Sequence, residues 1–305
     1  MSLYGIGLYA PAGFATEPAA VERAIERFEK VGHRVIVDPT VTSRWQRFSA
    51  PDDERLAAVM RMAEDPRIDL AIAVRGGYGW SRLLARLDFA RIATVPKRWL
   101  GHSDFTAFQL AALAAVGMVT FAGPLAAYDF GAETPSEFTL EHCWDLLAQS
   151  RHVARFPVGG PARFDAEGTL WGGNLSLVAH LVGTRYFPRI DGGILFLEDV
   201  SEHPYRIERM LYQLHLAGVL GRQRAVLLGE FNGYEIGAND EGYDLAAMIE
   251  HCRSAFGVPI FTGLPFGHRR DKLTLPVGGR CAVSVSGGIA RIELSDYRQD
   301  RRSNR

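Results

Sequence analysis

Hydrophobic residues follow two alternating patterns along the first half of the chain, one typical of buried strands and one typical of helices. Short, continuously apolar runs of strand length lie at residues 3–11, 33–38, 69–74, 98–102 and 118–124. Runs with apolar positions at helical spacing separate these strands, at 17–32, 51–65, a stretch ending near residue 92, and 105–117. This alternation predicts an α/β fold in which a mostly parallel sheet is covered by helices on both faces.

The second half has a different pattern after a helix predicted at 137–149. Residues 155–168 are rich in proline and glycine, so we interpret 151–167 as a linker between two domains, 1–150 and 168–305. Beyond it, helices at 205–218 and 243–257 are surrounded by apolar strands at 193–198, 225–231, 259–267, 281–287 and 290–294. Two glycines between the last two strands predict a hairpin.

Composition supports two globular domains. The chain has 305 residues, of which 47% are hydrophobic and 23% charged. This length exceeds the size at which a single hydrophobic core usually keeps growing. Its 34 Lys and Arg against 35 Asp and Glu leave no net field to attract nucleic acid or an anionic membrane. We therefore predict neither as a partner.

The ends of the chain and its cysteines indicate a cytoplasmic protein. The apolar N-terminus has no basic segment and is interrupted by Pro11, so it is read as a first strand rather than a signal peptide. No apolar run reaches the roughly 18 residues that span a bilayer. Cys143, Cys252 and Cys281 lie far apart in sequence, without the spacing of a metal site or a redox pair.

Polar or glycine-rich clusters follow four of the predicted strands, at residues 75–79, 101–104, 198–199 and 267–268. Ligands of open α/β sheets bind outside the carboxyl ends of strands. These four clusters therefore mark a candidate site.

The cluster "RGGYG" at 75–79 has three interpretations. Its glycines allow backbone N–H groups to approach a phosphate, but the spacing of both common nucleotide-binding loops is missing. It is also typical of a tight turn between strand and helix. In the third interpretation, one glycine N–H donates to a substrate oxyanion.

Ser103 precedes a predicted helix and is either its N-cap or a nucleophile held at a strand-to-helix turn. A serine nucleophile needs a base and a group that orients the base. His268 and Glu198 follow apolar strands and supply both, although alone they read as a surface histidine and a helix-capping carboxylate. The usual G-x-S-x-G turn has a small residue where this chain has Phe105, so the turn must differ in detail.

Several longer motifs resemble one family closely. They are "RGGYGWSRLL", "GHSDFTA", "TFAGP", "GTLWGGNLSLVAHLVGT", "GGILFLEDVSEHPYRIERMLYQL" and "TGLPFGHRRDKLTLPVG". In sequence and order they are similar to the LD-carboxypeptidases, the muramoyl-tetrapeptide carboxypeptidases of bacterial cytoplasm. The resemblance covers nearly the whole chain. It implies an N-terminal α/β domain like that of class I glutamine amidotransferases, a C-terminal domain with a β-barrel-like sheet, and a homodimer.

The resemblance also implies a serine peptidase with the triad Ser103, Glu198 and His268 and with no metal or cofactor. The reaction is hydrolysis of the amide between meso-diaminopimelate and the terminal D-Ala of murein tetrapeptides, in peptidoglycan recycling. Ser103 attacks the carbonyl while His268 acts first as base and then as acid. The N–H groups of Asp104 and Gly77 hold the oxyanion.

Three residues are candidates for substrate binding. Arg75 suits a substrate carboxylate because a guanidinium binds carboxylates through two hydrogen bonds; an ion pair with Asp88 is the alternative. Trp171 and Asn174 are candidates to line the cleft from the second domain. A core position for Trp171 and a helix cap at Asn174 explain them equally well.

Two other functions stay open. One is a self-immunity peptidase of the microcin C7 type, which cleaves peptidyl-nucleotide or aminoacyl-nucleotide antibiotics; those relatives carry an additional loop for the nucleotide, and this chain is compact. The other is a non-catalytic muropeptide-binding module. That module would be expected to lack a triad member, and no member is missing here.

Overall fold

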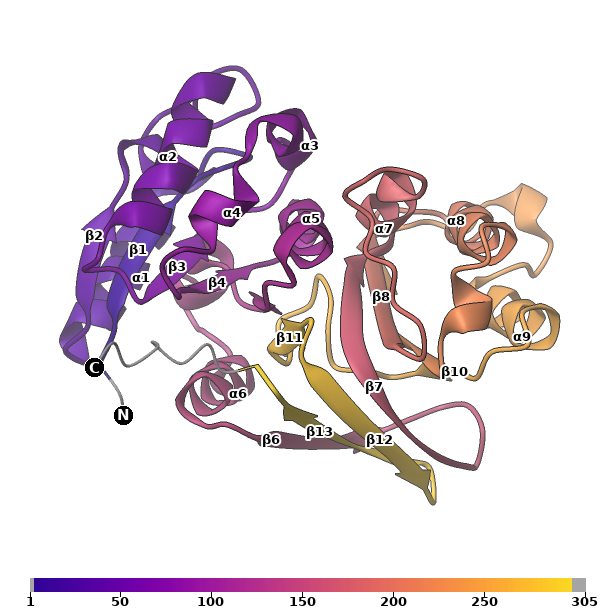
Figure 1. Cartoon of the computed structure of the whole chain (residues 1–305). Helices are drawn as coiled ribbons and strands as arrows, with labels where there is room; N and C mark the ends of the chain where they lie inside the picture. The colour runs from indigo at the N-terminus through magenta and orange to yellow at the C-terminus, as the bar shows by residue number, and fades with distance from the viewer. Residues whose placement is uncertain (1–2, 298–305) are drawn as a thin grey trace.

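The computed structural model describes residues 3–297 and contains two sheets (Figure 1). The first has six strands in the order β11-β5-β4-β3-β1-β2. Their bounds are Gly5–Tyr9 (β1), Arg34–Val37 (β2), Leu70–Ala73 (β3), Arg98–Gly101 (β4), Thr120–Ala122 (β5) and Leu275–Val277 (β11). β1 to β5 are parallel and β11 is antiparallel to β5. Every residue of β1 and β3 is buried, so both faces are covered, which confirms the predicted α/β sheet.

The helices of the first half follow the predicted periods closely. They are Pro18–Lys30 (α1), Asp52–Glu64 (α2), Trp80–Leu83 (α3), Phe89–Ile92 (α4), Thr106–Val116 (α5) and Glu137–Ala148 (α6). α1 has proline in its first turn and buries a single stripe of its surface. α5 instead buries every residue of its first two turns, because it lies between the first sheet and elements of the second half. This central helix follows Ser103 directly.

The second sheet has seven strands in the order β10-β9-β8-β7-β12-β13-β6. Their bounds are His152–Pro157 (β6), Arg163–Asn174 (β7), Ile194–Val200 (β8), Ala225–Asn232 (β9), Ile260–Thr262 (β10), Arg280–Ser286 (β12) and Ile289–Ser295 (β13). β7 to β10 are parallel, and β7, β12, β13 and β6 form an antiparallel ladder. The predicted hairpin of the last two strands is confirmed.

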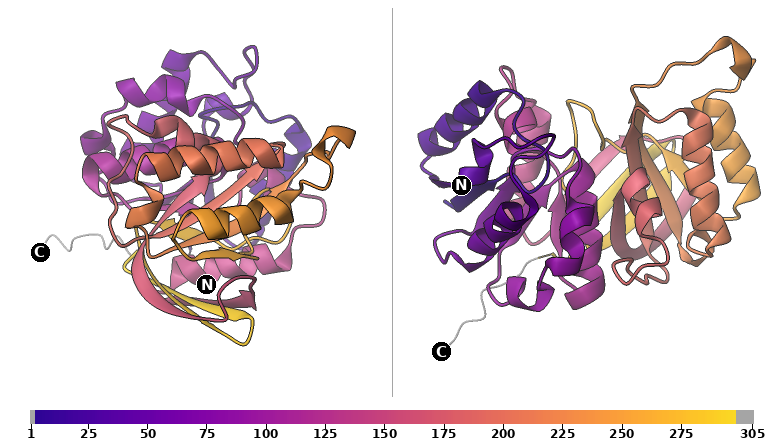
Figure 2. Two further views of the ribbon diagram at one scale, coloured as in Figure 1. Left: turned by 90° about the vertical axis from the view of Figure 1, so that its right-hand side faces the viewer. Right: turned by 90° about the horizontal axis from the view of Figure 1, so that it is seen from above.

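This second sheet is open rather than a closed barrel. One isolated bridge, Gly159 to Thr262, joins the chain after β6 to the opposite edge strand β10, but among residues 3–297 no continuous ladder closes the ring. The helices of the second half are Leu175–Leu181 (α7), Pro204–Leu216 (α8) and Leu245–Ala255 (α9). α8 and α9 lie side by side in front of the strands when the molecule is seen from their side (Figure 2).

The predicted linker 151–167 is itself part of the second sheet. β6 and the beginning of β7 lie within it, and its glycines form the connection between them. Pro157 ends β6 at the sheet edge, where a strand tolerates the missing N–H. β11 also returns from the second half to the first sheet. A division of the chain at 150 and 168 therefore stays a prediction.

Within residues 3–297, no helix combines the length and the apolar character required to cross a bilayer.

Candidate active site

Ser103 lies on a sharp turn between β4 and α5. Its φ of 64° is in the left-handed region, which costs a residue with a side chain about 1–2 kcal/mol. The turn differs from the usual nucleophile turn because Phe105 packs over Gly101, where an added Cβ would lie 2.6 Å from the ring atom Cδ1. As in the usual motif, a glycine is needed two positions before the serine, but the position two after it holds the large Phe105 ring. Phe105 in turn packs edge-on against Trp80.

The structure brings Ser103, His268 and Glu198 into one hydrogen-bonded chain. The Nε2 atom of His268 lies 3.1 Å from Ser103 Oγ, and its Nδ1 atom lies 2.7 Å from Glu198 Oε2. Glu198 is fully buried on β8, whereas a quarter of the His268 side chain is exposed in the loop after β10. A buried carboxylate, an imidazole and a hydroxyl in this order can activate the hydroxyl as a nucleophile.

Two glycines let the His268 loop lie against the sheet. Gly229 on β9 has no side chain to collide with the carbonyl oxygen of Phe266, and Gly267, with φ of 132°, would place a Cβ 2.9 Å from Glu230 Cβ. The N–H of Glu230 donates to the Phe266 carbonyl at 2.8 Å. The loop is thereby held at backbone distance from β9, next to Glu198.

Asn174 binds the carboxylates of β8 rather than lining the cavity. Its Nδ2 group donates to Asp199 Oδ1 at 2.8 Å and more weakly to Glu198 Oε1 at 3.3 Å. Its Oδ1 accepts the N–H of Leu177 and so caps α7, as one interpretation of the sequence expected. Burial raises the pKa of Asp199, although the hydroxyl of Ser176 hydrogen-bonds to it.

The contact between α5 and β7 sets the distance between the two halves of the site. Thr106 Oγ1 accepts the N–H of Asn174 at 3.0 Å. Gly173 lies directly against the Thr106 side chain, where an added Cβ would be 2.8 Å from Cγ2. Ser103 precedes Thr106 by three residues, and Glu198 is the partner of Asn174 across the β7–β8 ladder. The contact therefore positions the two residues relative to one another.

The hydroxyl of Ser103 opens on a cavity of about 360 Å³. The cavity is lined by Arg75, Gly76, Gly77, His102, Ser103, Leu125, Tyr128, Val200, His268 and Lys272. An added Cβ at Gly76 would lie 2.8 Å from Ser103 Cβ, and Gly77 has φ of 97°. Glycine is therefore required for the "RGGYG" turn to approach the serine this closely.

Asp104 connects the serine turn to the glycine-rich turn. Its carboxylate is buried and accepts the N–H of Trp80 at 3.0 Å. Burial raises the pKa of Asp104 to about 6, despite that hydrogen bond and the nearby charge of Arg55. Arg55 is also buried and donates to the carbonyls of Gly79 and Pro11. This role was not predictable from the sequence, since Arg55 occupies an ordinary polar position of a predicted helix.

Of the candidate substrate-binding residues, Arg75 lies at the cavity and Trp171 does not. Arg75 lines the cavity, donates to the Phe14 carbonyl at 2.9 Å and, within residues 3–297, has no carboxylate ion partner. Asp88, the alternative partner, caps α4 by accepting the N–H of Arg91. Trp171 is fully buried, bonds to Gln223 through Nε1 and does not line the cavity. Of the two interpretations that the sequence left open, the structure has Trp171 in the core position, with its ring buried beneath β7.

A buried ion pair beside the site was not predicted. Lys272 Nζ lies 2.7 Å from Asp129 Oδ1, and both side chains are almost wholly buried. Burial raises the pKa of Asp129, although Lys272 opposes this shift. Asp129 and the exposed Tyr128 come from a π-helical turn, Ala126–Phe130, a type of turn frequent at functional sites. Lys272 was visible only as part of the motif "GHRRDKLTLPVG".

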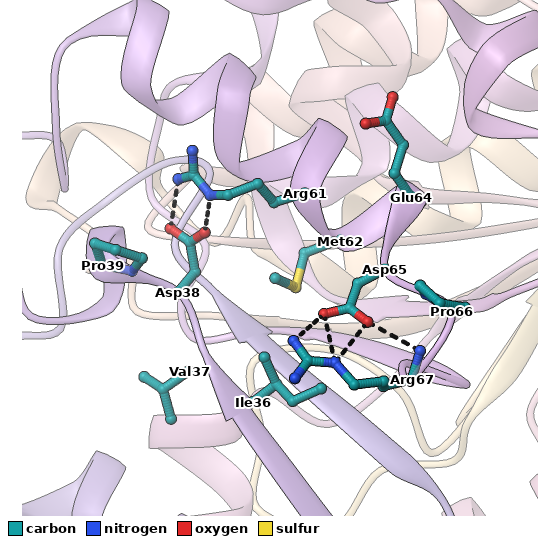
Figure 3. A pocket seen from close by; sticks show the side chains of 10 residues that line it. All are labelled: Ile36, Val37, Asp38, Pro39, Arg61, Met62, Glu64, Asp65, Pro66 and Arg67. Atoms are coloured by element: carbon teal, nitrogen blue, oxygen red, sulfur yellow. Dashed lines mark hydrogen bonds and ion pairs between the residues drawn. The ribbon is translucent and has the colours of Figure 1, made fainter.

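A second hollow, between the end of β2 and the end of α2, lacks the groups for such chemistry (Figure 3). It contains no histidine, serine or cysteine among its lining residues. Of its three carboxylates, Asp38 and Asp65 are bound to Arg61 and Arg67, at 2.7 and 2.6 Å, and Glu64 is paired with Arg91. The candidate site is therefore the cavity at Ser103.

Comparison with known proteins agrees with this geometry. Residues 6–123 match the model of the LD-carboxypeptidase N-terminal domain, and residues 167–283 match that of the LD-carboxypeptidase C-terminal domain. A crystal structure of muramoyltetrapeptide carboxypeptidase from Oxalobacter formigenes is similar with a TM-score of 0.91 and 43% identity, covering 96% of this chain and 99% of that one.

Curated relatives extend over almost the same length. A probable murein peptide carboxypeptidase of Bacillus subtilis is 30% identical over 94% of this chain and 91% of its own. The murein tetrapeptide carboxypeptidase of Pseudomonas aeruginosa is 30% identical over 90% and 91%. The microcin C7 self-immunity protein MccF of Escherichia coli is more distant, at 24% identity over 91% and 90%. With both domain models matched and relatives of at least 30% identity along nearly its full length, this chain belongs to the LD-carboxypeptidase family.

Proposed function

We propose that this protein is a serine LD-carboxypeptidase that hydrolyses the amide between meso-diaminopimelate and the terminal D-Ala of murein tetrapeptides, giving tripeptides in peptidoglycan recycling. The observation that carries the proposal is the hydrogen-bonded chain Ser103–His268–Glu198, which opens on a cavity lined by Arg75. The names of the relatives supply the substrate class.

In the first step, Ser103 Oγ attacks the carbonyl carbon and His268 Nε2 takes its proton over the 3.1 Å hydrogen bond. Glu198 holds the Nδ1–H of His268 and stabilises the imidazolium that forms. The N–H groups of Gly77 and Asp104 donate to the oxyanion. Losing one such donor typically lowers turnover about 100-fold to 1000-fold.

In the second step, His268 gives the proton to the amine of the leaving D-Ala, and water then hydrolyses the acyl-enzyme by the reverse proton path. A carboxypeptidase must also recognise the terminal carboxylate of its substrate. Arg75 supplies a guanidinium at the cavity that is not neutralised by a carboxylate of the described chain. Arg75 is the proposed ligand of the D-Ala carboxylate.

The compartment and the assembly are part of the same proposal. We place the enzyme in the cytoplasm as a homodimer, as the family resemblance implies. The three cysteines are unpaired and buried, which fits a reducing compartment.

The first test is release of D-Ala from free L-Ala-γ-D-Glu-meso-diaminopimelate-D-Ala in the presence of EDTA, followed by mass spectrometry. Wild type is expected to release D-Ala and Ser103→Ala to be inactive. Ser201→Ala is the matched control, because Ser201 is another serine with positive φ, at 60°, and it should retain activity.

The same assay separates the alternatives. Cleavage of an aminoacyl-sulfamoyl nucleotide without cleavage of the tetrapeptide would replace the proposal by the self-immunity function. Tight binding of tetrapeptide without turnover would indicate the muropeptide-binding module instead.

A further inference from the structure

His102 has a buried nitrogen whose bonding is incomplete. The side chain is only 3% exposed, and its Nε2 atom has no hydrogen-bond partner among the described residues. This nitrogen faces Glu198 Oε1 at 3.8 Å, a separation too long for a hydrogen bond. A buried polar nitrogen without a partner is destabilising, so binding of a ligand that bridges this gap would be favoured.

The neighbouring imidazole completes a set of three ligands. His102, Glu198 and His268 each offer one ligand atom, and these atoms lie within 4.8 Å of one another. Zinc bonds to imidazole nitrogen and carboxylate oxygen at about 2.0–2.2 Å, so two ligands of one tetrahedral ion lie about 3.4 Å apart. His102 Nε2 and Glu198 Oε1, at 3.8 Å, need to approach by only about 0.4 Å. Rotation of the partly exposed His268 ring supplies the third ligand.

We propose that His102, Glu198 and His268 form a binding site for a transition-metal dication such as Zn²⁺, and that the bound ion inhibits hydrolysis. Two imidazoles and one carboxylate suit Zn²⁺ better than Mg²⁺ or Ca²⁺, which prefer oxygen ligands. The positive charge of Lys272 nearby is neutralised by Asp129, so it does not by itself exclude a cation.

The ion has an entry path and a defined effect. His102 and His268 both line the cavity at Ser103, whereas His102 Nε2 and the Glu198 carboxylate are buried behind it. The ion therefore enters through the cavity, loses water as the His268 ring turns, and keeps water or Ser103 Oγ in a fourth position. A metal bond to a His268 nitrogen breaks one of its two hydrogen bonds, to Ser103 or to Glu198. The inhibitory part rests on the proposed function, whereas the binding part does not.

Binding is tested first, with full-length protein stripped by EDTA and desalted. Equilibrium dialysis against ZnCl₂ measures affinity, and the visible spectrum of bound Co²⁺ reports coordination. One ion per chain is expected for wild type and for Ser103→Ala, which keeps all three ligands. His102→Gln should weaken binding by at least about 10-fold to 100-fold, the range seen when an outer-shell partner of a metal ligand is removed.

His142→Gln is the matched control, because His142 and His152 form another close imidazole pair, with ring nitrogens 2.8 Å apart. This variant should bind the ion at the wild-type affinity. Equal zinc affinity in wild type and in His102→Gln, or no binding by wild type, would overturn the proposal. Should His102→Gln fail to fold by circular dichroism, Glu198→Gln gives the same test at a second ligand.

Inhibition is then measured as D-Ala release at increasing Zn²⁺. Wild type should lose activity and regain it with EDTA, and His102→Gln should need at least about 10-fold more zinc for half-inhibition of its own rate. Zinc bound at His102 without inhibition would overturn the inhibitory part. Zinc binding by a wild-type protein that never releases D-Ala would leave the metal site standing and reject the proposed function.

Discussion

Gly173→Ala tests whether the contact between α5 and β7 sets the geometry of the active site. The added Cβ would lie 2.8 Å from Thr106 Cγ2, about 1 Å short of an ordinary carbon–carbon contact. Because Thr106 is fixed in α5, the two halves must separate by a similar distance. The 3.1 Å hydrogen bond between Ser103 and His268 would then exceed hydrogen-bond length. A misplacement of about 1 Å costs on the order of 100-fold in rate.

The assay is steady-state D-Ala release, with kcat expected to fall about 100-fold and KM to change less. Alanine at φ of 134° also strains the backbone by about 1–3 kcal/mol. Gly288→Ala controls for that strain, since Gly288 also has positive φ, 73°, but no neighbour within 4 Å. Adding Thr106→Ala to Gly173→Ala should restore part of the rate. A folded Gly173→Ala with wild-type kcat, or an equal loss in Gly288→Ala, would refute the reasoning.

Three further predictions concern stability and are measured by urea unfolding. Burial raises the pKa of Asp104 to about 6, so its native form keeps a proton that the unfolded form has lost between about pH 4 and pH 6. The contribution of Asp104 to the free energy of unfolding therefore falls as pH rises through that window. Relative to wild type, the free energy of unfolding of Asp104→Asn should increase by up to about 3 kcal/mol between pH 4 and pH 7. A difference between the two proteins that does not change with pH would contradict this. Lys272→Met leaves the Asp129 carboxylate buried alone and should cost about 3–5 kcal/mol. The double variant with Asp129→Asn should lose less, and additive losses would show that the two charges do not interact. Gly101→Ala should cost about 1–3 kcal/mol through overpacking against Phe105, and Phe105→Leu should recover part of it; no recovery would place the strain elsewhere.

The prediction of the first sheet succeeded because its information is local. The elements alternate in period, and the predicted helix at 105–117 is observed at Thr106–Val116. Polar clusters at strand ends were expected to converge at one edge, and Ser103, Glu198 and His268 do lie together. Residue type and strand position identified these three groups. Their meeting depends on the packing of the two sheets, because Ser103 follows β4 of the first sheet while Glu198 and His268 belong to the second.

Other parts could not be obtained from local pattern. The Pro and Gly content of 151–167 indicated a linker, yet β6 pairs with β13 from the other end of the chain. Asn174 was predicted to face substrate or cap a helix, and its bonds to the β8 carboxylates depend on the neighbouring strand. A tryptophan is as typical of a binding cleft as of a core, and only the direction of the Trp171 side chain distinguishes the two positions.

The sequence by itself determined the order of elements in the first half, their α/β alternation and the identities of the groups that can perform acyl transfer. Tertiary structure alone decided that His268, 165 residues after Ser103, lies 3.1 Å from its hydroxyl, that β11 joins the first sheet and that His102 faces Glu198. Local periodicity depends on neighbours a few residues apart, which the sequence displays directly. Contacts across the chain depend on register and on close backbone approaches, such as that of Gly173 to Thr106, and these arise only when the two sheets pack together.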